Sequence, residues 1–208
     1  MQNLSKLVRR QIFKNIRNWV WEGFFTYLLL KEKKVEHKEI IGVDVYDNCR
    51  REEIKRLANK FEFKKIKEDG DLPFLSNYFD LVFSMDVIEH VIDWEKFILG
   101  QIKVTKRGGE ILIGTPNRLR LSNLLLSLFG KLSYPRSMGH DEYGEILHLR
   151  EFRKKELLSF LASLGNRVKN IDVIPCWLGS NFLKIGFDRP KGVLGNFCQF
   201  WFVKFAKS

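Results

Sequence analysis

The sequence of 208 residues predicts an α/β fold with a mostly parallel sheet and flanking helices. Two observations support this prediction. Short β-branched or apolar runs alternate with longer segments of helical periodicity, a pattern typical of strand–helix units stacked around a parallel sheet. The composition, with 45% hydrophobic and 29% charged residues, is that of a globular chain long enough to bury a substantial core.

The expected elements follow in chain order. Residues 1–38 carry a basic amphipathic pattern, in which apolar residues recur at every fourth position from Leu4 to Val20. From residue 39 the character changes, and we expect a separate α/β domain over 39–208. Its strands are expected at 40–45, 63–66, 79–84, 110–114, 168–175 and 200–205, and its helices at 50–60, 94–104, 119–129 and 152–164. The segment 130–145 is expected to be irregular because it contains Gly, Pro and Ser.

The net charge of +11 is concentrated at the two ends of the chain. Residues 1–38 hold nine Lys or Arg against three acids, and residues 180–208 hold five against one. Such ends favour an anionic partner such as lipid headgroups, nucleic acid or an acidic substrate, or they simply solvate the surface. No recognisable RNA-binding module is present, so nucleic acid is the least expected of these partners.

The sequence argues against secretion and against a membrane-spanning helix. No stretch approaches the ~20 apolar residues that such a helix needs, and the N-terminus lacks a signal-peptide pattern. The cysteines Cys49, Cys176 and Cys198 are too far apart for a zinc knuckle, which favours a reducing compartment. We therefore expect a cytoplasmic protein, with peripheral binding to an anionic inner-membrane surface through its basic termini as an alternative. The aromatic segment 197–205 could serve that binding, but a buried final strand is the preferred interpretation.

A series of motifs between residues 39 and 174 resembles the class I S-adenosylmethionine-dependent methyltransferase superfamily, of the methyltransferase type 11 kind. The motifs are Ile41-Gly42-Val43-Asp44, Asp69-Gly70-Asp71-Leu72-Pro73-Phe74, Tyr78 to Ser84, Val87-Ile88-Glu89-His90-Val91, Lys106 to Gly109, Ile113 to Asn117, and His148 to Phe152. The resemblance implies a Rossmann-like methyltransferase fold with S-adenosylmethionine as the cofactor. The acceptor implied is a small molecule, a glycan or a lipid-linked compound, and the oligomeric state is not assigned.

The resemblance also assigns the cofactor-binding residues. Asp44 ends the first expected strand of the domain, where ligands of parallel sheets gather, and would accept the ribose hydroxyls; a helix N-cap or turn acid is the alternative. Asp69 would accept the adenine amino group, with Glu68 and Asp71 as rivals and an ordinary Asx turn as the alternative. The set is completed by residues beside the first motif and near the methionine end: Gly42, Ser84, Met85 and Asp86.

The glycine-rich loop of the family is degenerate in this chain. Aligned on Gly23, the expected acid falls on Arg17, and two expected glycines fall on Trp19 and Trp21. A Cβ at such positions would collide with the ligand or forbid the required dihedral angles, so only Gly23 remains as a cofactor-binding candidate there. A catalytically silent methyltransferase-like module is therefore the competing interpretation, and an N-terminal segment that is not the first strand of the sheet is another.

His90 is the candidate catalytic residue, because an imidazole near its ordinary pKa can remove a proton from an acceptor hydroxyl. Asp86, Glu89 and His90, joined by His148 or His140, also resemble the metal cluster of some RNA-terminal and quinone O-methyltransferases. A helix-capping role for Glu89-His90 is the preferred alternative, and no metal is assigned. The segment 118–150 is expected to form a lid on the acceptor side.

Overall fold

The computed structural model describes residues 39–46, 51–57, 60–67, 71–141, 144–180, 185–187 and 190–208. The chain divides into two compact units, residues 1–68 and 69–208. The predicted amphipathic segment 1–38 lies outside the described residues, so both that segment and the boundary predicted near residue 38 stay predictions. None of the helices described is long and apolar enough to cross a membrane.

The described part of the first unit is a strand–helix–strand segment. Strand β1 (Ile40–Asp44) is followed by helix α3 (Arg51–Leu57) and strand β2 (Phe61–Lys65). The two strands pair in parallel, with Ile40 opposite Phe61 and Asp44 opposite Lys65. Ile54 of α3 is buried, as expected for the apolar position of a crossover helix.

The second unit begins with a strand–helix–strand segment of its own. Strand β3 (Phe79–Met85) leads through a turn to helix α4 (Trp94–Val104), which is followed by strand β4 (Thr105–Pro116) and helix α5 (Leu121–Leu128). Asp93 caps α4 by accepting a hydrogen bond from the backbone nitrogen of Lys96 at 2.9 Å. Strand β4 begins before the predicted residue 110. The predicted turn at Gly108 (φ 74°) lies within the strand, where the pairing with β3 shifts register.

The rest of the second unit adds a hairpin, a helix and two long strands. The hairpin is formed by β5 (Arg136–Asp141) and β6 (Gly144–His148). Helix α6 (Lys154–Ser163) and strand β7 (Val168–Cys176) follow, and β10 (Phe200–Lys207) completes the chain of elements. Between β7 and β10 lie the short strands β8 (Leu178–Ser180) and β9 (Ile185–Phe187), while the 3-10 helices η3 (Gly165–Arg167) and η4 (Gly192–Phe197) precede β7 and β10 respectively.

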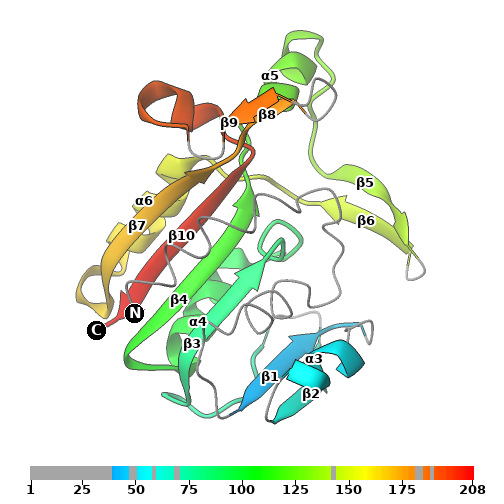
Figure 1. Cartoon of the computed structure of the whole chain (residues 1–208). Coiled ribbons are helices and arrows are strands. Elements are labelled where there is room, and N and C mark those ends of the chain that lie inside the picture. The colour runs from blue at the N-terminus through cyan, green and yellow to red at the C-terminus, as the bar shows by residue number, and fades with distance from the viewer. Residues whose placement is uncertain are drawn as a thin grey trace. The chain divides into compact units, whose positions relative to one another are not determined.

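The main sheet of the second unit has four strands in the order β3-β4-β10-β7 (Figure 1). Strand β3 is parallel to β4, whereas β10 is antiparallel to both β4 and β7. Three of the four strands therefore point the same way and one is reversed. This confirms the predicted α/β class with a mostly parallel sheet and flanking helices, and it confirms the final segment as a buried strand.

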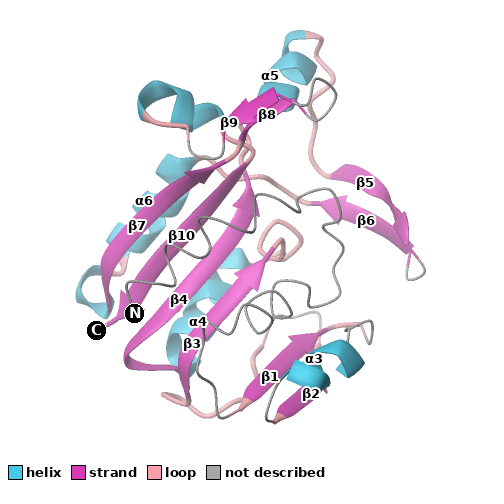
Figure 2. Cartoon of the chain, in the orientation of Figure 1, coloured by secondary structure: helices cyan, strands magenta, loops and turns pink. Residues whose placement is uncertain are grey.

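Helices α4 and α6 cover one face of this sheet (Figure 2). Trp94 of α4 contacts Phe160 of α6 edge to face, with ring centroids 4.9 Å apart, so the two helices lie side by side. The core between helices and sheet includes Ile98, Leu157 and, from the sheet, Phe205. Apolar residues on alternate positions of β10 supply much of this core, because successive side chains of a strand face opposite sides.

The prediction of an irregular segment over 130–145 is confirmed for residues 130–135 and is wrong for residues 136–141 and 144–145. Residues 136–141 and 144–148 form the two strands of the hairpin β5–β6, with Arg136 opposite His148 and a register shift between Ser137 and Gly139. No apolar alternation marks β5, and most of its residues are exposed. The backbone hydrogen bonds of the hairpin are therefore what make it a strand pair, and these leave no periodic signal in the sequence.

Candidate active site

A cluster of polar side chains lies at the carboxyl ends of β3 and β4. These parallel strands end at Met85 and Pro116, and the edge of a sheet beyond such ends is where ligands gather in α/β proteins. Asp86 directly follows β3 with a φ of 52°, and its backbone nitrogen donates to the carbonyl of Gly114 at 3.0 Å. The turn after Asp86 carries Glu89 to the end of β4.

Glu89 is completely buried at this edge. The hydroxyl of Thr115 donates to Oε2 of Glu89 at 2.9 Å, and the backbone carbonyl of Glu89 accepts from the nitrogen of Leu149 at 2.9 Å. Its Oε1 receives no hydrogen bond from any residue in the described ranges. Burial, followed by the negative charge of Asp86, raises the pKa of the Glu89 carboxyl well above its usual value. A proton shared with the carboxyl of Asp86, with which Glu89 forms a side-chain hydrogen bond, or a bound cation would neutralise it.

Two histidines face each other beside Glu89. The rings of His90 and His148 meet edge to face, with centroids 4.8 Å apart. Nδ1 of His90 lies 2.7 Å from the carbonyl of Leu147, and Nδ1 of His148 lies 3.0 Å from Oε1 of Glu151. A carbonyl and a carboxylate can only accept, so each Nδ1 carries the hydrogen and donates it. In the neutral ring the lone pair is then on Nε2, the atom that acts as a base or a metal ligand.

Burial, followed by the charge of His148, lowers the pKa of His90 to about 4. The ring of His90 is therefore neutral at pH 7, which suits a lone-pair donor. Burial has the opposite effect on the acid Asp86 and raises the pKa of its carboxyl to about 7. The hydrogen bond with Glu89 and the positive charge of Arg120 act against this increase.

Glu89, His90 and His148 form a group that could hold a metal ion. One potential ligand atom from each residue lies within 4.8 Å of the others. Two imidazoles and one carboxylate are a donor set used for Zn²⁺ and for Fe²⁺ with open coordination positions. Of the histidines considered from the sequence, the structure brings His148 into this group, whereas His140 lies exposed on β5.

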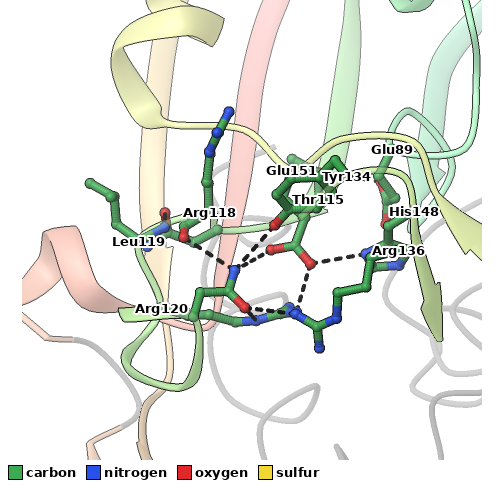
Figure 3. A network of polar contacts seen from close by, with 11 residues as sticks. Glu89, Thr115, Arg118, Leu119, Arg120, Tyr134, Arg136, His148 and Glu151 are labelled. Atoms are coloured by element: carbon green, nitrogen blue, oxygen red, sulfur yellow. Dashed lines mark hydrogen bonds and ion pairs between the residues drawn. The ribbon is translucent and has the colours of Figure 1, made fainter. Parts of the chain in front are cut away.

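Glu151 is the centre of the polar network that supports His148 (Figure 3). Its Oε1 accepts from Nη2 of Arg120 at 2.6 Å as well as from His148, and its Oε2 accepts from Nδ2 of Asn123 at 2.5 Å. Burial alone would raise the pKa of Glu151, but the hydrogen bond from His148 and the positive charge of Arg120 hold it below its usual value. The carboxylate is therefore ionised, and it aligns the imidazole of His148.

The same network ties the predicted lid to the sheet. Asn123 belongs to α5, and its side-chain oxygen accepts from Nη1 of Arg136 of β5 at 3.0 Å. Its amide nitrogen also donates to the carbonyl of Arg118 at 3.1 Å. Burial, followed by the charge of Glu151, raises the pKa of the Tyr134 hydroxyl. Helix α5 and the hairpin make up most of the segment 118–150. Hydrogen bonds through Asn123 and His148 thus connect both of them to the carboxylate of Glu151.

The cofactor residues predicted after β3 have different surroundings. Ser84 is buried, and its hydroxyl accepts from Nε2 of Gln101 at 3.1 Å. Met85 is half-buried, and its sulfur lies so close to Gly114 that a Cβ at that glycine would collide with it. Asp86 joins Glu89 and His90 at the polar cluster. Of the three, Asp86 is the one that stands beside the chemistry-bearing side chains.

The other predicted cofactor residues lie elsewhere. Asp44 ends β1 in the first unit, and Gly42 lies two residues before it, where an added Cβ would be in contact with the rings of Phe61 and Phe63. Asp71 is exposed in the second unit and forms an ion pair with Nζ of Lys96 at 3.0 Å. Gly23, Arg17, Trp19, Trp21, Glu68 and Asp69 lie outside the described residues, so the predictions on them stay predictions.

Several residues of the network have no role predicted from the sequence. In the sequence, Arg120 and Asn123 are part of an expected helix rich in leucine, and no function is predicted for them. A charged residue and an amide within such an apolar run are nevertheless a signal of buried polar contacts. Thr115 and Glu151 stand within the quoted motifs without a function. Burial and partners cannot be deduced for them from spacing alone.

Comparisons with known proteins find similar methyltransferases. A family model described as a methyltransferase domain matches residues 22–113. The chain is 30% identical over 98 residues to the human mitochondrial ubiquinone biosynthesis O-methyltransferase, a match that covers 44% of this chain and 27% of that protein. It is 26% identical over 133 residues to a protein of Mycolicibacterium smegmatis named "Probable S-adenosylmethionine-dependent methyltransferase", covering 64% of this chain and 45% of that one. The matches thus span less than half the length of both curated relatives.

Solved structures support the fold. An S-adenosylmethionine-dependent methyltransferase from Archaeoglobus fulgidus superposes with a TM-score of 0.58 at 18% identity, covering 98% of this chain and 94% of that one. Another from Methanosarcina mazei gives a TM-score of 0.52 at 17% identity, covering 82% of each chain. Over residues 22–113 the chain matches a methyltransferase domain, and the two curated relatives and the motif series agree with the class I S-adenosylmethionine-dependent methyltransferase superfamily, whose cofactor is S-adenosylmethionine.

Proposed function

We propose that this protein transfers a methyl group from S-adenosylmethionine to a nucleophilic group of a small-molecule, glycan or lipid-linked acceptor. The observation that carries the proposal is Asp44, an acid at the carboxyl end of a parallel strand within the region that the family model matches. This is the position at which α/β folds present a carboxylate to the ribose of a nucleoside.

The surroundings of Asp44 fit the adenosyl group. Its carboxyl is half-buried, and burial raises its pKa, against the opposing hydrogen bonds from the backbone of Tyr46 and Val45. The Tyr46 nitrogen donates to Oδ1 at 3.1 Å, which fixes the carboxyl at the end of the strand. A half-buried acceptor held in place in this way is suited to receive two hydroxyl hydrogens.

Methyl transfer requires alignment more than acid–base chemistry. Holding the donor and the acceptor in line can contribute up to roughly 7–11 kcal/mol in favourable cases. In this proposal Asp86 lines the methionine end and His90 takes the proton of the acceptor through Nε2. The low pKa of His90 keeps this nitrogen unprotonated at pH 7 but makes it a weak base, so His90 would contribute mainly with acceptors that are already acidic.

Calorimetric titration with S-adenosylmethionine tests the proposal. The wild-type chain is expected to bind, and Asp44→Ala is expected to abolish binding. Asp172→Ala, which removes an exposed carboxylate from the middle of β7, serves as the matched control and should bind as the wild type does. No binding by the wild type at millimolar cofactor would refute the proposal and favour the silent methyltransferase-like module.

A second candidate function is methyl transfer that depends on a divalent cation. It is favoured by the unpartnered Oε1 of Glu89 within the described residues and by the two histidines, each held through Nδ1 so that Nε2 is directed for binding. Histidine ligands of metals usually donate their other ring hydrogen to an oxygen in this way. A bound cation would neutralise Glu89 and polarise a hydroxyl of the acceptor.

Binding of Co²⁺ followed by visible absorption, and of Zn²⁺ by calorimetry, tests this candidate without any activity measurement. We expect one equivalent of metal to bind and His148→Ala to abolish the binding. His140→Ala, the exposed histidine of β5, is the matched control and should leave it intact. Equal loss in both variants, or no binding by the wild type, would rule out the cation site.

A further inference from the structure

Helix α5 buries an amide and exposes three of its five leucines, whereas Leu124 and Leu126 are half-buried. Its Asn123 is fully buried in the network around Glu151. Leu121, Leu125 and Leu128, at helical spacings of four and three, are exposed on the other side, and Leu128 is 80% exposed. A helix on the surface of a globular protein normally buries its leucines and exposes its amides. The described residues of the second unit therefore leave the apolar side of α5 uncovered.

A second exposed apolar segment lies at the same end of the second unit. Val193 and Leu194 of η4 are exposed, and Phe129 directly after α5 is 74% exposed. Asn117, which precedes α5, donates through Nδ2 to the backbone carbonyl of Asn196 in η4 at 2.8 Å and so links the two segments. Both segments lie beyond the end of β4 in Figure 1. We call the six residues Leu121, Leu125, Leu128, Phe129, Val193 and Leu194 the apolar tip.

Basic side chains lie near Leu119 and Asn196, two residues that are close in sequence to the apolar tip. A shallow hollow there is lined by Leu119 and Asn196 together with the first residues of α6, namely Arg153, Lys154 and Lys155. No acid lines this hollow among the described residues. Glu156, in the same turn of α6, accepts a hydrogen bond from the backbone nitrogen of Arg153 at 2.6 Å and so caps its own helix. Further along, Lys131 follows α5 and Lys191 precedes η4, and both are exposed.

We propose that the apolar tip docks on an anionic lipid bilayer. The leucines and Phe129 would enter the boundary between headgroups and acyl chains, while the flanking lysines and Arg153 contact lipid phosphates. Exposed leucine and phenylalanine beside Lys and Arg are the composition of segments that lie in a membrane interface. The net charge of +11 adds long-range attraction to an anionic surface.

The charge pattern favours an anionic lipid surface over a second copy of this chain, whose net charge of +11 would repel it. The cations lie beside the tip and the acids of this region, Glu151 and Glu156, are engaged within the chain. Docking of this kind does not depend on the proposed methyl transfer. It would, however, bring an acceptor anchored in the same membrane close to the polar cluster, because α5 shares the carboxylate of Glu151 with His148.

Sedimentation with vesicles tests the proposal on the full chain. We expect binding to vesicles that contain phosphatidylglycerol, weak binding to pure phosphatidylcholine vesicles, and loss of binding as salt is raised. The variant Leu125→Ser/Leu128→Ser/Phe129→Ser should lower the affinity for the anionic vesicles roughly tenfold or more. Its control is Leu75→Ser, which removes a side chain of similar exposure (77%) that precedes β3 and lies at the opposite ends of β3 and β4. This control should bind as the wild type does.

A second pair of variants tests the cations. Lys154→Gln/Lys155→Gln should weaken binding and reduce its salt dependence, whereas Lys169→Gln, an exposed lysine at the start of β7, should do neither. Circular dichroism and thermal unfolding confirm that each variant is folded. Wild-type affinity in the triple variant would overturn the proposal and assign any vesicle binding to another segment, such as residues 1–38. Self-association that the triple variant abolishes, without vesicle binding, would equally overturn it, because the tip would then be a protein interface.

Discussion

Replacing Glu151 by glutamine should destabilise the second unit strongly. Arg120 and Glu151 form an ion pair whose side chains are 9% and 0% exposed, with 2.6 Å between Nη2 and Oε1. Removing one partner of such a pair leaves a buried charge without compensation and costs about 3–5 kcal/mol. The amide nitrogen of the introduced glutamine, unlike a carboxylate oxygen, cannot accept from Asn123 or His148. We therefore expect Glu151→Gln to lower the free energy of unfolding by about 3 kcal/mol or more.

Urea unfolding followed by tryptophan fluorescence measures this effect. The control is Asp80→Asn, which breaks the ion pair between Asp80 and Lys106 at 2.8 Å. Those side chains are 85% and 45% exposed, so the control should cost less than about 1 kcal/mol. The double variant Arg120→Met/Glu151→Gln removes both charges and should recover part of the stability lost in Glu151→Gln alone. Equal costs for Glu151→Gln and Asp80→Asn would refute the reasoning, since burial would then not govern the strength of the pair.

Three further predictions concern the same unit. Thr115→Val should lower the free energy of unfolding in urea by about 1–3 kcal/mol, because it removes the hydroxyl that donates to buried Glu89. Thr115→Ser keeps the hydroxyl and should lower it less. Equal losses in the two variants would contradict the role of the hydroxyl. Gly114→Ala should cost about 1–3 kcal/mol, because its Cβ would collide with the sulfur of Met85. Wild-type stability in that variant would show that the sulfur moves freely. The pKa of His90 is about 4 in the folded chain against an ordinary 6.5, so the unfolded chain takes up a proton first and stability should be lost as the pH falls from 6.5 to 4. His90→Gln should remove about 3 kcal/mol of this loss, as urea midpoints measured across that range would show, and an unchanged pH profile would contradict it.

The sheet of the second unit was predictable because its strands are apolar runs with few interruptions. Phe79 to Ser84 and Phe200 to Phe205 are rich in β-branched and aromatic residues, and both became strands close to the predicted ranges. The hairpin β5–β6 was not predictable, because Arg136 and its neighbours have no apolar alternation. Its position depends on backbone pairing and on the contact of Arg136 with Asn123, which are tertiary features.

The candidate site was predictable only in its local part. Glu89 and His90 stand together in one motif, so the sequence indicated them as a pair. The choice between His148 and His140 depends on the register of the hairpin, which places His148 at the end of β6 opposite Arg136. The role of Glu151 was hidden for a similar reason, since its partners come from α5 and from His148. Contacts between distant segments decide the site, and residue types alone do not encode them.

The central position of β10 has a consequence for synthesis in the cell. This strand lies between β4 and β7, so it supplies hydrogen bonds to two strands that are made before it. Until residues 200–207 leave the ribosome, β4 and β7 each keep an unpaired edge, and the apolar surface that Trp201 and Phe205 fill stays open to water. Nascent chains of this protein are therefore expected to need protection by chaperones, and a premature stop before Phe200 should yield insoluble material rather than a smaller folded unit.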